Sequence, residues 1–84
     1  MDRYIAAHKF SFRNRALLEK DSLCGCFNCK KTFSPDQILD WLDEDETALC
    51  PFCYIDSVIG ESSGFPITEE FLEGMRRYYF SPHH

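Results

Sequence analysis

The chain has 84 residues, of which 27% are charged, and its formal net charge is −5. This length predicts a single domain over residues 1–84, too small to bury a large core without added stabilisation. The apolar runs are shorter than the roughly 20 residues of a membrane-spanning helix, and the first ten residues lack the apolar core of a signal peptide. We therefore expect a cytoplasmic protein with no membrane association.

The charge is unevenly distributed. Residues 1–31 hold seven basic and three acidic residues, a net charge of +4, whereas residues 32–84 hold two basic and eleven acidic residues, a net charge of −9. The negative total argues against a dedicated nucleic-acid binder, for which a basic domain is expected. Nucleic-acid binding stays open as an alternative, through four cations of the basic third: Arg13, Arg15, Lys30 and Lys31.

The N-terminal third is predicted to form an N-terminal arm followed by one short helix. Residues 1–10 have no clear pattern, so we expect an arm that is either flexible or packed on the core. A helix is predicted over residues 13–21, capped by Ser11 or Asn14, with its leucines on the buried side.

Two Cys-x2-Cys pairs separated by twenty residues form the most specific pattern in the chain, and their members are Cys26, Cys29, Cys50 and Cys53. A two-residue gap allows a tight turn in which both sulfurs point to one centre, and four thiolates at about 2.3 Å complete a tetrahedron around Zn²⁺. An odd number of cysteines in a reducing compartment makes disulfides a poor explanation. The sequence therefore predicts one zinc ion per chain, whose binding energy would help a small domain to fold.

The fifth cysteine, Cys24, lies two residues before Cys26 and could replace a ligand in another register. A site closed by four sulfurs has no open position for water or substrate, so it predicts a structural role and no catalytic activity. Iron also suits tetrahedral sulfur ligation, which leaves rubredoxin-like electron transfer as a further alternative.

The segment between the cysteine pairs predicts a helix over residues 34–43. Ser34 is a typical N-cap, Pro35 suits the first helical position, and Gln37 completes a capping box. The acidic run at residues 43–46 is predicted to be a solvated turn, and residues 47–49 a short strand.

The C-terminal third predicts the longest helix, over residues 68–79 with Thr68 as its cap. Before it, Asp56 or Ser57 is a candidate hydrogen-bond partner of the metal ligands. The helix has an aromatic face that includes Tyr78 and Tyr79, and four aromatics between residues 71 and 80 exceed what a small core needs. We therefore expect a surface for a protein partner or a homodimer there. Residues 81–84 are predicted to be a tail.

The combination of CGCFNC at residues 24–29, TALCPFC at residues 47–53 and GFPIT at residues 64–68 resembles a family of small, uncharacterised bacterial proteins called only cytoplasmic proteins. The resemblance spans about residues 8–80 and implies a zinc-binding fold with the four paired cysteines at matching positions. It implies no activity. The family's usual glycine after the second cysteine pair is Tyr54 here, which puts the standard turn in doubt. A looser analogy relates the pattern to zinc-ribbon and rubredoxin-like modules.

These observations predict a small α+β zinc-binding domain with two cysteine turns, about three short helices and a short hairpin. The leading functional hypothesis is a non-enzymatic adaptor that binds a protein partner through its aromatic helix or its charged faces.

Overall fold

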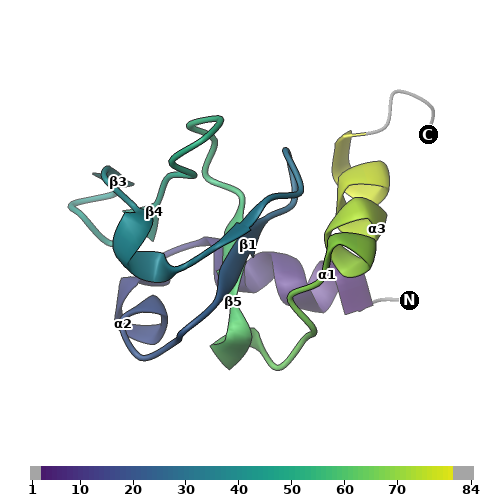
Figure 1. The fold of residues 1–84 in the computed structure, drawn as a ribbon, viewed down its shortest axis with the longest axis horizontal. Coiled ribbons are helices and arrows are strands. Elements are labelled where there is room, and N and C mark those ends of the chain that lie inside the picture. The colour runs from purple at the N-terminus through teal and green to yellow at the C-terminus, as the bar shows by residue number, and fades with distance from the viewer. Residues whose placement is uncertain (1–2, 81–84) are drawn as a thin grey trace.

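The computed structural model describes residues 3–80, which form a small α+β fold around strand β1 (Figure 1). Strand β1 (Cys24–Cys26) pairs antiparallel with β2 (Thr32–Phe33) on one side and with β5 (Val58–Gly60) on the other. A separate hairpin joins β3 (Trp41–Leu42) to β4 (Thr47–Ala48). The predicted fold class is confirmed. The predicted tail at residues 81–84 lies outside the described residues.

Short helices surround this sheet. Their bounds are α1 (Arg3–His8), α2 (Arg15–Leu18) and α3 (Glu69–Phe80), with 3₁₀ turns η1 (Lys9–Ser11), η2 (Pro35–Gln37) and η3 (Glu61–Ser63). Helices α1 and α3 pack together on one side of the molecule, and α2 lies on the opposite side near the hairpin (Figure 1). The N-terminal segment is thus helical from Arg3 and packed on the rest of the chain.

Strand alternation divides the core into two clusters. Cys24, Cys26 and Val58 belong to the cluster on the metal side, whereas Ile59, the neighbour of Val58, belongs to the cluster covered by α3. Gly25 faces α3 from the centre of β1, and a Cβ atom there would lie 2.7 Å from Leu72 Cδ1. Glycine therefore allows the helix to pack directly against the strand.

Helix α2 begins and ends inside the predicted range of residues 13–21. Hydrogen bonds of a turn continue to Asp21, whose N–H donates to the Leu18 carbonyl at 3.0 Å. The side chain of Asn14 makes no capping bond. Its amide instead donates to the carbonyls of Phe10 and Val58, both at 2.8 Å, and its Oδ1 accepts from the N–H of Ala48 at 3.2 Å. Asn14 therefore joins the N-terminal segment to both sheets.

The predicted helix over residues 34–43 is wrong. Its start forms as expected, because Pro35 opens η2 and Gln37 Oε1 accepts from the N–H of Ser34 at 3.2 Å. The turn ends at once, since Ile38 is extended with φ −71° and ψ 125°. Ile38 is 8% exposed and packs into the metal-side cluster, and residues 41–42 pair with β4. Core packing and strand pairing override the helix propensity here.

The C-terminal helix is confirmed. Thr68 Oγ1 accepts from the N–H of Phe71 at 3.2 Å, so the predicted cap is formed. Gly74 occurs inside the helix because the ring of Tyr4 from α1 lies over it and would collide with a Cβ atom. No helix among residues 3–80 is long and apolar enough to cross a membrane.

Candidate metal centre

Four cysteine sulfur atoms lie close together beside β1. The Sγ atoms of Cys26, Cys29, Cys50 and Cys53 all lie within 4.8 Å of one another. The Cys26–Cys53 pair is 3.6 Å apart and the Cys29–Cys50 pair is 3.7 Å apart. A tetrahedral site with sulfur bonds of about 2.3 Å has edges of about 3.8 Å, whereas a disulfide needs about 2.05 Å. The observed spacing thus fits a metal site and excludes disulfides between these pairs.

The two cysteine turns, residues 26–30 and residues 50–54, have the same local structure. In each, the backbone N–H two residues after the first cysteine donates to its sulfur, at 3.3 Å and 3.4 Å respectively. The N–H four residues after the first cysteine donates to its carbonyl, at 2.8 Å and 2.9 Å. Two equivalent turns, each aimed at the same centre, place the four sulfurs together.

Each turn ends on a left-handed residue. Lys30 has φ 67° and Tyr54 has φ 59°, in the region that glycine adopts at least cost. Tyr54 therefore takes the turn conformation in spite of its side chain, and the absence of glycine leaves the turn intact. Its side chain is 55% exposed, so the ring meets no steric barrier from the core.

Polar groups from outside each pair surround the sulfurs. The side-chain amide of Asn28, in the first turn, donates to Cys53 Sγ in the second turn at 3.4 Å. The Ser57 hydroxyl lies 3.0 Å from Cys26 Sγ, so it can donate to a thiolate there. Ser57 is buried and Asp56 is exposed, which places the predicted hydrogen-bonding role on Ser57. Such donors stabilise the negative charge of metal-bound thiolates.

Without a metal, the buried thiols resist ionisation. Burial raises the pKa of both Cys26 and Cys50. Burial acts in the same direction on Cys53, but hydrogen bonds, led by that from the Asn28 side chain, outweigh it and lower the pKa of this thiol. A metal binds the thiolate form, so its binding displaces protons from Cys26 and Cys50.

Cys24 has a different environment. It is fully buried, its Sγ donates to the carbonyl of Phe33 at 3.4 Å, and it is not part of the four-sulfur group found among the described residues. Burial, followed by the negative charge of Asp21, raises the pKa of Cys24 to about 12. The sequence left open whether Cys24 replaces one of the four ligands. In the structure the thiol of Cys24 packs in the core beside the four-sulfur group.

The four candidate cations contact different parts of the fold. The guanidinium of Arg13 lies over the ring of Phe12, and Lys31 Nζ lies 5.5 Å from the ring centre of Phe52. Lys30 Nζ pairs with Glu73 of α3 at 2.7 Å. Arg15 contacts Glu19 and the hairpin. Lys30 is thus directed to α3 and Arg15 to the hairpin.

The two candidate tyrosines of α3 differ in exposure. Tyr78 is 47% exposed. The ring of Tyr79 packs against His8 in a tilted arrangement with centroids 4.4 Å apart, and its hydroxyl donates to the Tyr4 carbonyl at 3.3 Å. Tyr79 therefore joins α3 to α1, and Tyr78 is the more available of the two for a partner.

Sequence reasoning missed two contributors to the site region. The first is Asn28, whose position between two ligands could have indicated a hydrogen bond to a sulfur of the other turn. The exposed apolar residues of the second turn were a second signal: Phe52, Tyr54 and Ile55 are 49%, 55% and 36% exposed. Phe52 lies between the two ligands of this turn, and Tyr54 and Ile55 directly follow the second ligand.

Comparison with protein-family models, curated protein sequences and solved structures finds no match for this chain. The class is therefore defined by fold and site alone. The protein is a small α+β domain in which four cysteines, from two equivalent turns, form a group able to hold a metal ion.

Proposed function

We propose that the four cysteines bind one zinc ion per chain and that the protein is a non-enzymatic module that binds another protein. The observation that carries the metal assignment is the spacing of 3.6 Å and 3.7 Å between sulfurs of different turns. Four sulfurs fill a tetrahedral zinc site and leave no position for water, so the ion supplies stability rather than chemistry. Zinc has no redox chemistry, so the half-buried position of Cys29 and Cys53 does not imply electron transfer at the site.

The binding role is supported by apolar side chains on a surface that the metal makes rigid. Phe52 lies between two ligands, and Tyr54 and Ile55 follow directly, all with more than a third of their surface exposed. Tyr78 adds an exposed aromatic ring on α3. Clusters of exposed large apolar side chains on small domains mark interaction sites, and a metal-fixed turn reduces the entropy lost when a partner binds.

Cys24 and Cys26 form a matched pair of buried thiols on the same strand, and substituting each tests the metal assignment. Cys26→Ala removes a ligand, and structural zinc contributes on the order of 10 kcal/mol to folding, so we expect loss of zinc and of the folded state. Cys24→Ala should keep one zinc per chain and lose about 1–2 kcal/mol of stability from packing. Metal content by native mass spectrometry and unfolding by circular dichroism measure both.

Three outcomes would contradict the metal assignment. They are iron in the purified protein, retention of zinc by Cys26→Ala, and equal zinc loss in both variants. The binding role is tested separately by affinity capture with immobilised wild-type protein and with Phe52→Ser and Tyr78→Ser variants. Capture of a protein that depends on zinc and is lost in one of these folded variants supports the role. Identical capture by wild type, both variants and zinc-free protein would refute it.

A further inference from the structure

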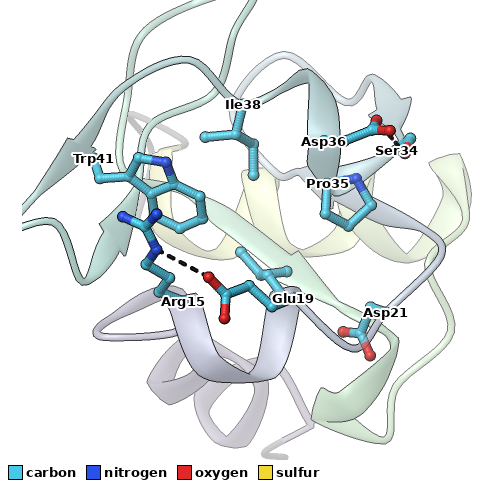
Figure 2. Close-up of a pocket in the computed structure, with 9 residues that line it drawn as sticks. Arg15, Glu19, Asp21, Ser34, Pro35, Asp36, Ile38 and Trp41 are labelled. Atoms are coloured by element: carbon cyan, nitrogen blue, oxygen red, sulfur yellow. Dashed lines mark hydrogen bonds and ion pairs between the residues drawn. The ribbon is translucent and has the colours of Figure 1, made fainter.

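A groove of about 460 Å³ lies between α2 and the segment that joins the two cysteine turns. Figure 2 shows its two walls. Arg15, Leu18 and Glu19 come from α2 and the residue that follows it, and Asp36, Ile38 and Trp41 come from the opposite segment. Helix α2, which forms one of these walls, lies on the other side of the molecule from α3 (Figure 1).

The floor of the groove is apolar and firmly held. Leu18 and Ile38 are 1% and 8% exposed and belong to the metal-side cluster. The guanidinium of Arg15 lies over one face of the half-buried ring of Trp41, 4.6 Å from the ring centre. Arg15 in turn bonds to Glu19 Oε2 at 3.1 Å and to the Asp45 carbonyl at 2.9 Å. These contacts fix the aromatic surface before any ligand arrives.

The rim of the groove is acidic. Three of its lining residues, Glu19, Asp21 and Asp36, carry carboxylates, against the single guanidinium of Arg15, which gives the groove a net charge of −2. Asp21 accepts from the N–H and the hydroxyl of Ser62 at 3.0 Å and 2.6 Å. The hydroxyl of Ser34 donates to Asp36 at 2.6 Å. All three donor groups are neutral, so they orient the carboxylates of Asp21 and Asp36 without cancelling their charge.

We propose that this groove binds a basic segment of a partner protein, with an apolar side chain on Trp41 and Ile38 and a lysine or arginine at the carboxylates of Glu19 and Asp36. The inference deepens the proposed binding function, on which it rests. An apolar floor bounded by an excess of negative charge favours a partner segment with positive charge. Tryptophan is also the residue type that contributes most often to binding energy at protein interfaces.

The groove depends on the metal centre. Its upper wall is the segment between Cys29 and Cys50, so both ends of that wall are fixed by metal ligands. Within the segment, the N–H of Leu49 donates to the Asp40 carbonyl at 3.1 Å. Ile38 packs in the same cluster as Cys50. Binding in the groove therefore requires the zinc-loaded protein.

Trp41 is the single tryptophan of the chain, so its fluorescence reports directly on the groove. The probe is a short synthetic peptide of alternating arginine and leucine, titrated into zinc-loaded protein at low ionic strength. The control peptide has glutamate in place of each arginine. We expect saturable binding of the basic peptide alone, weakened by added salt because the charges are exposed.

Glu19→Gln and Asp36→Asn should each weaken peptide binding about twofold to fivefold, the range of an exposed ion pair. Glu69→Gln removes one negative charge from α3, which lies on the other side of the molecule from α2 (Figure 1), and should leave binding unchanged. Zinc content and circular dichroism are measured for every variant, so a loss of binding in a folded, zinc-loaded variant identifies the groove.

Four results would overturn the inference. They are no fluorescence change with the basic peptide, equal binding of the acidic peptide, equal weakening by Glu69→Gln, and a salt-sensitive dimer of the protein whose formation blocks the peptide. The last result would assign the groove to a second copy of the chain. These failures leave zinc content and capture through the second cysteine turn unaffected, and they are thus separable from failure of the proposed function.

Discussion

Replacing Asn14 with alanine should remove one of the larger polar contributions to stability among residues 3–80. The Asn14 side chain is 2% exposed and makes three hydrogen bonds, at 2.8, 2.8 and 3.2 Å, to segments that include β5 and β4. A buried hydrogen bond contributes about 0.5–1.5 kcal/mol. Asn14→Ala should therefore lower the free energy of unfolding by about 2–4 kcal/mol, against roughly 4–13 kcal/mol expected for a domain of this size.

Urea unfolding of the zinc-loaded protein, followed by circular dichroism, measures this loss. A urea dependence of about 1–3 kcal/mol per molar converts it into a midpoint shift on the order of 1–2 M. Asn14→Leu fills the space without the hydrogen bonds, so a similar loss in both variants attributes the effect to those bonds. Gln37→Ala is the matched control, because its exposed amide makes one bond, to the N–H of Ser34.

The reasoning fails if Asn14→Ala unfolds within about 0.5 kcal/mol of the wild type, which is the range of an ordinary surface substitution. It also fails if Gln37→Ala is equally destabilising. The first result would mean that the carbonyls of Phe10 and Val58 find other donors at little cost, and the second that burial does not decide the cost of the lost bonds.

Three further predictions concern the turns, the sheet and the metal. Tyr54→Gly should raise the unfolding free energy by up to about 1 kcal/mol, because left-handed backbone costs other residues about 1–2 kcal/mol and glycine loses part of that gain in entropy. Lys30→Gly should gain less, because it also removes the ion pair with Glu73. Destabilisation of the Tyr54→Gly variant in chemical unfolding would disprove this reasoning. Gly25→Ala should destabilise the protein by about 1–3 kcal/mol through overpacking, since the new methyl group would lie 2.7 Å from a Leu72 carbon; an unchanged melting temperature would contradict it. Zinc occupancy should fall as pH falls, because burial raises the pKa of Cys26 and Cys50 and protons compete for the thiolates; a chromogenic chelator measures release, and pH-independent release would refute the assignment.

The cysteine cluster was predictable because its geometry is mostly local. A Cys-x2-Cys turn is specified by hydrogen bonds that reach two to four residues along the chain, and the same pattern forms in both turns. Once two such turns lie side by side, their four sulfurs form the site. The C-terminal helix was predictable for a similar reason, since the Thr68 cap and the apolar spacing both lie within one segment.

The failed helix at residues 34–43 and the role of Asn14 have a common cause. Their determinants lie far away in the sequence: the Asn14 side chain bonds to residues 34 and 44 positions away, and Ile38 packs in one cluster with Leu18 and Val58, each 20 positions away. A capping box specifies where a helix begins and not whether the residues after it are needed elsewhere. No local pattern could have indicated either contact.

The packing of α1 against α3 provides a side of the molecule through which it can be attached to a support. The Tyr79 hydroxyl bonds to the Tyr4 carbonyl, so both helices lie together, opposite α2 and the hairpin (Figure 1). A support or fused domain attached through either helix leaves the groove facing outward. The same adjacency suits circular permutation, with a linker from α3 to α1 and new ends in the exposed turn at residues 43–46. Each half of such a chain would carry one cysteine turn, and a metal ion bound by all four cysteines would cross-link the two halves.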